Sequence, residues 1–393
     1  MSTVDFDVIV AGSGPAGLVA ACLAAGHGFA TAMITGPLND RPDPRTVALM
    51  MPSLAILGEC GLWPAMVQEW AAPLRKLRLV DDTGALLAAP ELVFSATELG
   101  LDAFGWNIPL ARLKPALEAR ARDLCVSFHA HSVVGFFGDA EKATLSLSDG
   151  TTLAARVAMA ADGRNSVLRR AVGIGTVSWA YDQTAIAISF AHSQPHRDVS
   201  SEYHKPAGPF TTVPLPGRRS SLVWMEKPAR AAELMRFADH ALAAEIQALS
   251  HGGLGLISDI GPRQSFPMSG ARAETFARDR VMLIGEAAHV VPPIGAQGLN
   301  MSLRDAEDAI ALISAARDGG QDFGAAKVLG DYDRRRQLDV RPRQAVIDLM
   351  NRSLLSGYLP MEAGRAVGLT ALASFGPLRR FAMSMGLGRA LQP

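Results

Sequence analysis

The feature that most limits the fold is a glycine-rich turn close to the N-terminus. Residues 6–11 form a short apolar run typical of a buried parallel strand, and it ends at Gly12-Ser13-Gly14-Pro15-Ala16-Gly17. Residues 15–27 are rich in Ala and Leu and predict a helix, and a second apolar strand is expected from Phe29 to Thr35. Strand, turn, helix and strand form a βαβ unit, so the chain is predicted to begin with a parallel sheet.

The glycine spacing of this turn is typical of dinucleotide binding. The glycines permit a tight turn, let the backbone approach a pyrophosphate, and allow close packing of helix on strand. The helix N-terminus adds N–H donors and a partial positive charge. The pattern alone does not choose between NAD and FAD. The acidic residue expected about 20 positions on for the ribose is absent, because this strand ends in Thr35; Asp40 and Asp43 are candidate substitutes.

Two later segments also place polar residues after an apolar strand. Asp162-Gly163 follows the run Val157–Ala160 and leads through Arg164 toward a helix. The third segment, residues 281–306, is a strand followed by a stiff loop and a new helix. Glu286 at the strand end is placed to bind a ribitol or ribose hydroxyl, and N–H groups at the helix start would stabilise negative charge on a reduced flavin. The loop and helix start contain Pro292, Pro293, Gly295, Gly298, Leu299 and Asn300.

In this order the three segments resemble the group A flavoprotein monooxygenases, which have the fold of para-hydroxybenzoate hydroxylase. The resemblance covers nearly the whole chain and implies that FAD is the cofactor. It places Arg45 near the flavin and links Asp162 to both FAD and pyridine-nucleotide function. Glu286 stands where most members have Asp, and Leu110 where many have a polar flavin contact. The predicted cofactor-binding residues are Gly12, Gly14, Pro15, Ala16, Gly17, Arg45, Asp162, Glu286, Pro293, Gly295, Gly298, Leu299 and Asn300.

The resemblance also implies an α/β fold class. It consists of a Rossmann-like FAD-binding domain, an inserted antiparallel-sheet substrate domain and a helical C-terminal tail. A hairpin is expected from Leu77 to Ala89, and residues 126–160 are expected to form a small antiparallel meander. The predicted domains are residues 1–75, 105–177 and 268–322 for FAD, 76–104 and 178–267 for the substrate, and 323–393 for the helical region.

Within the group, the chain is most similar to the ubiquinone-biosynthesis hydroxylases. The similar segments are Phe104–Pro109, Ser265–Met268 and Tyr332–Arg336. The implied reaction is hydroxylation of a phenolic ring, here of a polyprenylated phenol, with NAD(P)H as co-substrate and O₂ consumed. The flavin carries this chemistry, so no catalytic side chain and no metal site is assigned. For His289, a packing or hydrogen-bonding role weighs at least as much as a role as base.

Three other functions compete with hydroxylation. Phe104-Gly-Trp-Asn-Ile-Pro109 differs at its first residue from the W-x-W-x-I-P signature of flavin-dependent halogenases, but it precedes Asp162-Gly163, where that signature is not expected. A geranylgeranyl-type reductase of the same fold would saturate alkenes without oxygen. A non-enzymatic module would bind flavin and show no substrate-stimulated NAD(P)H oxidation.

The composition limits the partners and the compartment. Net charge is zero over 393 residues, which gives no electrostatic basis for binding nucleic acid. Cys22, Cys60 and Cys125 form no C-x-x-C pair, and neither a signal peptide nor a long apolar span is apparent, so we expect a cytoplasmic protein. The segments Leu349–Leu359 and Phe375–Leu387 suggest either a membrane-facing surface or an ordinary helical cap. A homo-oligomer and a biosynthetic complex both stay open.

Overall fold

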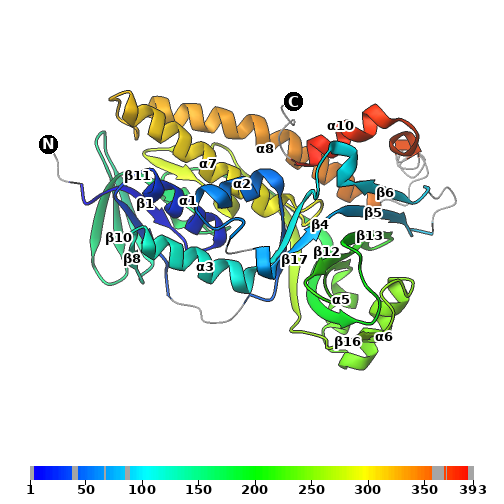
Figure 1. Cartoon of the computed structure of the whole chain (residues 1–393). Coiled ribbons are helices and arrows are strands. Elements are labelled where there is room, and N and C mark those ends of the chain that lie inside the picture. Colours follow the sequence, from blue (N-terminus) through cyan, green and yellow to red (C-terminus); the bar gives the residue numbers. More distant parts are fainter. Residues whose placement is uncertain are drawn as a thin grey trace.

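Two large sheets stand toward opposite ends of the molecule, and a small three-stranded sheet joins them (Figure 1). The computed structural model describes residues 4–37, 43–65, 68–84, 89–355, 367–368 and 370–387. The mixed α/β architecture predicted from the sequence is confirmed.

The first large sheet contains the predicted N-terminal βαβ unit. Its central strands are parallel and run in the order β19 (Val281–Leu283), β11 (Thr152–Ala160), β1 (Phe6–Ala11), β2 (Thr31–Ile34) and β8 (Ser127–His129). Three antiparallel strands complete it: β18 (Ala277–Arg278), β9 (Val133–Gly138) and β10 (Ala143–Leu147). Because parallel strands are covered on both faces, most side chains of the central strands β1, β11 and β19 are apolar.

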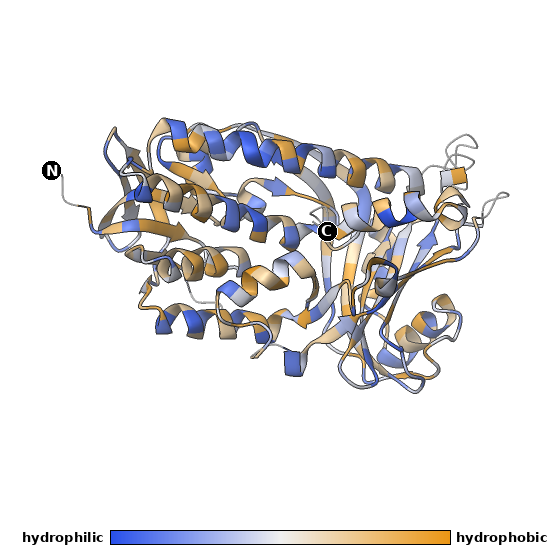
Figure 2. Ribbon diagram, turned by 45° about the horizontal axis from the view of Figure 1, so that its top comes forward, coloured by the Kyte–Doolittle hydropathy of each residue, from blue (hydrophilic) through white to orange (hydrophobic). Residues whose placement is uncertain are grey.

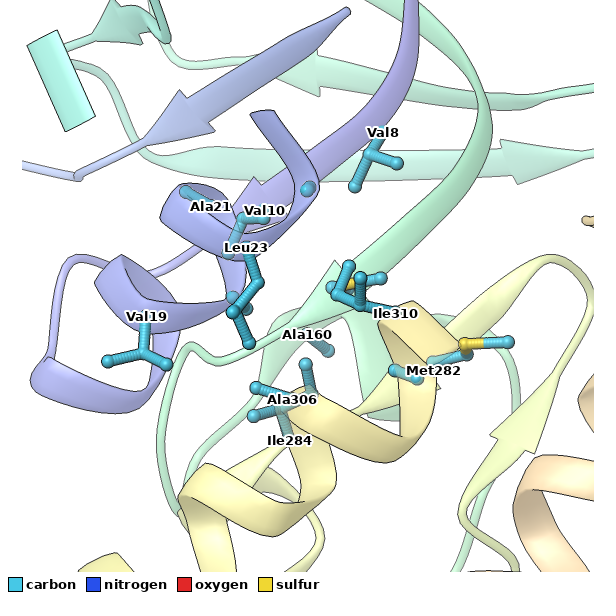
Figure 3. Packing of buried hydrophobic residues seen from close by; sticks show 14 of the residues in the cluster. Val8, Val10, Val19, Ala21, Leu23, Ala160, Met282, Ile284, Ala306 and Ile310 are labelled. Atoms are coloured by element: carbon cyan, nitrogen blue, oxygen red, sulfur yellow. The ribbon is translucent and has the colours of Figure 1, made fainter. Parts of the chain in front are cut away.

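Helix α1 (Pro15–Gly26) packs against this sheet and against two further helices. These are α7 (Gln297–Asp318) and α3 (Leu110–Asp123). Residues 17–24 of α1 are all buried, as expected of a helix enclosed by the core on every side. Figure 3 shows Val10, Leu23 and Ile310 close together in this core. The start of α1 is therefore held rigidly at the carboxyl ends of the parallel strands.

The second large sheet is mainly antiparallel. Its order is β20 (His289–Val290), β17 (Gln264–Ala273), β12 (Thr176–His192), β15 (Arg219–Glu226), β14 (Gly208–Leu215), β13 (Val199–Lys205), β5 (Lys76–Asp81) and β6 (Leu92–Ser95), with the short β16 (Ile257–Ser258) on β12. Only the β13–β5 pair of this order is parallel. Helices α5 (Pro228–Leu234) and α6 (Asp239–Leu249) cover one face, where Phe210 and Trp224 pack against Ile246.

The small sheet connects the two parts of the molecule. It has the order β3 (Thr46–Met50), β7 (Gly105–Pro109) and β4 (Ala72–Leu74), and all its pairs are antiparallel. Leu49 and Ile108 project into the core of the first large sheet, whereas Met50 projects into a separate apolar cluster with Met383. The remaining elements are α2 (Met51–Glu59), α4 (Val167–Ala171) and the short 3₁₀ turns η1 (Gln68–Trp70), η2 (Ala96–Leu99) and η3 (Gly285–Ala287).

The C-terminal part is helical, as predicted. Helix α8 (Ala326–Leu355) runs across the top of the molecule in Figure 1, and α10 (Gly376–Leu387) lies near β6. Figure 2 shows hydrophilic and hydrophobic residues mixed along these helices. No helix among the described residues has both the length and the apolar character needed to cross a bilayer.

Three local predictions need correction. The hairpin predicted from Leu77 to Ala89 has its second strand later, at β6, which begins at Leu92, so the connection is longer than a tight turn. Residues 85–88 lie outside the described part. Within the predicted meander, β8 instead pairs in parallel with β2. Helices α5 and α6 were not predicted in the sheet-rich segment.

The domain boundaries stay predictions. The predicted boundary between residues 177 and 178 falls inside β12.

Candidate functional site

The glycine-rich turn is held by backbone-to-backbone contact. Gly12 has φ +108°, in the region that glycine favours, and a Cβ there would meet the Ala161 carbonyl oxygen at 2.2 Å. A Cβ on Gly17 would lie 2.0 Å from the Gly12 carbonyl oxygen. Both positions therefore require glycine for packing alone, whether or not a ligand is bound.

Gly14 differs because the space beside it is open. No heavy atom lies within 4 Å of the Cβ position that a side chain would occupy there. Helix α1 begins at the next residue, Pro15, and has no acidic residue in its first turn. The unpaired N–H groups and the positive end of the helix dipole thus adjoin an open space, which suits a pyrophosphate.

The polar groups expected at the ribose are already engaged. The Thr35 hydroxyl donates to the Gly36 carbonyl at 3.0 Å. Asp43 accepts hydrogen bonds from the Arg45 Nε at 2.9 and 3.0 Å. Burial by itself raises the pKa of Asp43, but the hydrogen bonds and charge of Arg45 outweigh it and leave that pKa lowered. Asp40 lies outside the described residues, so the ribose contact stays an open prediction.

Arg45 lies where the small sheet begins. Its guanidinium stands over the Phe266 ring, 5.3 Å from the centroid, and this ring belongs to β17 of the second large sheet. Arg45 therefore bridges the two parts of the molecule, and its predicted place beside the flavin stays a prediction.

Asp162 has one carboxylate oxygen bound and one free. Oδ2 accepts the Val167 backbone N–H at 2.8 Å and so caps α4. Oδ1 is buried and has no partner among the described residues. A buried carboxylate oxygen without a donor needs an explanation, and a ligand hydroxyl or a water would supply one. The Asp162 side chain is thus oriented by α4 and keeps one acceptor available.

The second and third segments meet through two arginines. Arg164 Nε donates to Glu286 Oε2 at 2.9 Å, and the buried Arg169 donates to the Ala287 carbonyl at 2.8 Å. The Glu286 side chain is 52% exposed, so it keeps surface on which a ribitol or ribose hydroxyl can bind. The structure brings these two predicted segments together although they are more than a hundred residues apart in the chain.

Asn300 joins the third segment to the small sheet. Its Nδ2 donates to the Ala48 and Ala296 carbonyls at 2.8 and 2.6 Å, and its Oδ1 accepts the Met50 N–H at 2.9 Å. Helix α7 begins at Gln297, so the predicted residues Gly298 and Leu299 lie in its first turn. A Cβ on Gly295 would meet nothing within 4 Å, and Pro293 is exposed. The first turn of α7 is therefore held beside β3.

His289 has a structural partner. Its Nε2 lies 2.7 Å from Asp305 Oδ2, and both side chains are almost fully buried. Asp305 also accepts the Gly285 N–H at 2.9 Å and the Arg336 Nε at 2.7 Å. Burial by itself raises the pKa of Asp305, but His289 and Arg336 outweigh it and lower that pKa. The hydrogen-bonding role expected for His289 is the one the structure shows.

Sequence reasoning missed the carboxylates that organise this region. Asp305 was not singled out, and Arg336 was noted only within a run of arginines. The available signal was the i, i+3 spacing of Asp305 and Asp308 on α7, which places both on one helix face. Among the described residues, no group of His, Cys, Asp or Glu side chains could hold a metal ion.

Comparison with known proteins places the chain in a family. The model of the FAD binding domain family matches residues 5–342. The chain belongs to the FAD-dependent monooxygenases. The ubiquinone hydroxylase UbiL of Rhodospirillum rubrum is 30% identical over 389 residues, covering 97% of this chain and 89% of that protein. The 3-demethoxyubiquinol 3-hydroxylase of Escherichia coli is 29% identical over 404 residues, covering 99% of this chain and 100% of that protein.

Solved structures share the fold of this monooxygenase. The p-nitrophenol 4-monooxygenase PnpA from Pseudomonas putida has a TM-score of 0.80 at 20% identity, with 99% of both chains covered. The flavin-dependent halogenase CmlS has a TM-score of 0.72 at 19% identity. Its superposition covers 90% of this chain and 65% of the halogenase chain. At these identities the likeness concerns the fold alone, and the full-length relatives named above are hydroxylases.

The described residues of this monooxygenase fit FAD. Open space beside Gly14, an acid-free start of α1 and the free Oδ1 of Asp162 each offer what a bound dinucleotide needs. When bound, FAD supplies the redox chemistry, with NAD(P)H as reductant and O₂ as oxidant. The residues predicted to contact FAD remain predictions.

Proposed function

We propose that this monooxygenase hydroxylates the phenolic ring of a polyprenylated precursor in ubiquinone biosynthesis. The observation that carries the proposal is the similarity to the ubiquinone hydroxylase UbiL along 97% of this chain. Both the FAD-binding segments and the second large sheet, which would hold the substrate, are included in that match.

The apolar packing beside the third segment supports an aromatic substrate. Ile294 of the loop before α7 packs in one cluster with Met225, Met268 and Ala185 of the second large sheet and with Ile347 of α8. Apolar walls beside the loop before α7 would exclude water from a cofactor bound there, which suppresses side reactions. A phenol with an apolar tail would bury its ring against such walls.

The test uses the purified protein reconstituted with FAD. We expect 2-geranylphenol to stimulate both NAD(P)H oxidation and O₂ uptake, and to gain one oxygen atom by mass spectrometry. Product chlorinated in the presence of chloride would favour the halogenase, and alkene saturation without O₂ uptake would favour the reductase. FAD binding without substrate-stimulated NAD(P)H oxidation would leave only a flavin-binding module.

We also propose a peripheral contact with a membrane through α8 and α10. Val346, Leu349 and Met350 follow i, i+3, i+4 spacing on α8 and are 44–62% exposed. Helix α10 has a similar exposed apolar set, which consists of Leu378, Phe381 and Met385. Phe375, just before the helix, is exposed as well. Exposed apolar helix faces are typical of surfaces that enter the headgroup region. Such a contact would let a polyprenylated substrate enter from the bilayer.

A further inference from the structure

A carboxylate lies in the middle of the second large sheet. Glu202 of β13 stands directly across from Thr211 of β14, whose hydroxyl donates to Glu202 Oε2 at 3.3 Å. His204 Nε2 lies 2.9 Å from Glu202 Oε1, so both carboxylate oxygens are held in place. The Glu202 side chain is 17% exposed, and no Lys or Arg among the described residues forms an ion pair with it. A largely buried carboxylate without a cation is stabilised by each further hydrogen-bond donor that reaches it.

This carboxylate points to the face of the sheet that α5 and α6 leave uncovered. Phe210 of β14 and Trp224 of β15 pack toward those helices. Their neighbours Thr211 and Val223 point to the opposite face, because side chains alternate along a strand. Glu202 shares that face because it pairs directly with Thr211. Glu202, Thr211 and Val223 are all partly exposed although their strands are internal to the sheet, so space remains in front of them.

Two apolar clusters border that space. In the first, the α8-side cluster, Met225 of β15 packs with Ile347 of α8. In the second, the α10-side cluster, Leu79 of β5 packs against residues that include Met383 of α10. Met225 points away from α5 and α6 by strand alternation, and Leu79 pairs with Glu202, so both lie on the face of the carboxylate. Strands β14 and β13 separate β15 from β5, which places Glu202 between the two clusters.

The loop before α7 contacts both clusters. Ile294 packs in the α8-side cluster, and Ala296 packs against the α10-side cluster. Gly295 therefore spans the gap between them, and a Cβ at this position would meet nothing within 4 Å. The loop predicted to hold the flavin and the sheet face that carries Glu202 thus border the same open space.

We propose that Glu202 accepts a hydrogen bond from the phenolic hydroxyl of the substrate and so holds the ring between this sheet and the loop before α7. A charged acceptor binds a phenol O–H strongly, whereas a methyl ether has no proton to donate. This inference rests on the proposed function. Glu202 is a binding residue, and His204 and Thr211 are positioning residues that fix its carboxylate.

The experiment compares two ligands on wild type and on Glu202→Gln. Binding of 2-geranylphenol and of its methyl ether, 2-geranylanisole, is followed by the change in flavin absorbance of the FAD-bound protein. We expect wild type to bind the phenol at least about tenfold more tightly than the ether. Glu202→Gln keeps the shape of the side chain but loses its charge, so the preference should fall to roughly threefold or less. The melting temperature of the apoprotein should stay close to that of wild type.

The matched control is Glu226→Gln in β15 of the same sheet. Glu226 is also partly exposed, but it lies two residues after Trp224 and therefore points to the face that α5 and α6 cover. It should retain the full phenol preference. An unchanged preference in Glu202→Gln, an equal fall in Glu226→Gln, or no preference in wild type overturns the proposal. Preferential phenol binding without hydroxylation by wild type would refute the proposed function and leave the binding site standing.

Discussion

At the scale of single residues, Gly14 and Gly17 differ in what a methyl group would meet. Gly14 has φ −70° and ψ 167°, which any residue adopts, and open space at its Cβ position. Gly14→Ala should therefore fold normally yet bind FAD at least about tenfold more weakly, because the methyl group would occupy the path of the pyrophosphate. Apoprotein melting and flavin titration measure the two effects.

Two further substitutions in the same helix serve as controls. A Cβ on Gly17 would lie 2.0 Å from a carbonyl oxygen, so Gly17→Ala should lose about 1–3 kcal/mol of folding stability. Gly26 has open space and lies at the other end of α1, and Gly26→Ala should bind FAD normally. Equal FAD affinity in Gly14→Ala and Gly26→Ala would contradict the predicted phosphate site.

At the scale of elements, one arginine joins α7 to α8. Arg336 is 1% exposed and donates to Asp305 and Asp308 of α7 at 2.7 Å each, and to Asp339 at 2.9 Å. Arg336→Met would leave buried carboxylates without their counterion, so we expect a loss of about 3–5 kcal/mol in unfolding free energy. Chemical denaturation measures it.

The pH dependence of stability follows from the same cluster. Burial by itself raises the pKa of Asp339, but Arg304 and Arg336 outweigh it and lower that pKa to about 2 from 3.8. A lowered acid pKa stabilises the fold above the unfolded value and loses this contribution as pH falls toward 2. In Arg336→Met the loss should begin at higher pH. Arg334→Met, whose side chain is 72% exposed, is the control and should follow wild type.

At the scale of the whole molecule, the exposed apolar residues of α8 and α10 predict membrane binding. Phe381→Ser should weaken sedimentation with phosphatidylglycerol vesicles by roughly tenfold, since a Phe side chain contributes about 1.5–3 kcal/mol when buried. Phe137 on β9 is 66% exposed against 62% for Phe381, and Phe137→Ser is the matched control. Equal vesicle binding by both variants would exclude α10 as the contact.

Local sequence patterns predicted much of the FAD-binding part. The βαβ unit follows from short-range rules. An apolar run forms a buried strand, and glycine readily adopts the φ of +108° that Gly12 has at the turn. The second large sheet was less predictable. Helices α5 and α6 were missed because propensity is a weak guide where tertiary packing against Phe210 and Trp224 decides the outcome.

The sequence by itself determined the N-terminal βαβ unit and its glycine-rich turn, because backbone geometry and glycine spacing act over a few residues. The choice of FAD over NAD came from the resemblance of three segments, in their order, to a known family. Only the tertiary structure decided which polar side chains are buried and how they pair. Arg334 and Arg336 are two residues apart, yet one is largely exposed and the other buried among aspartates. Asn107 is likewise ordinary in sequence, and its amide has no hydrogen-bond partner among the residues that the structure describes. Burial and pairing depend on contacts between distant segments, which no local pattern contains.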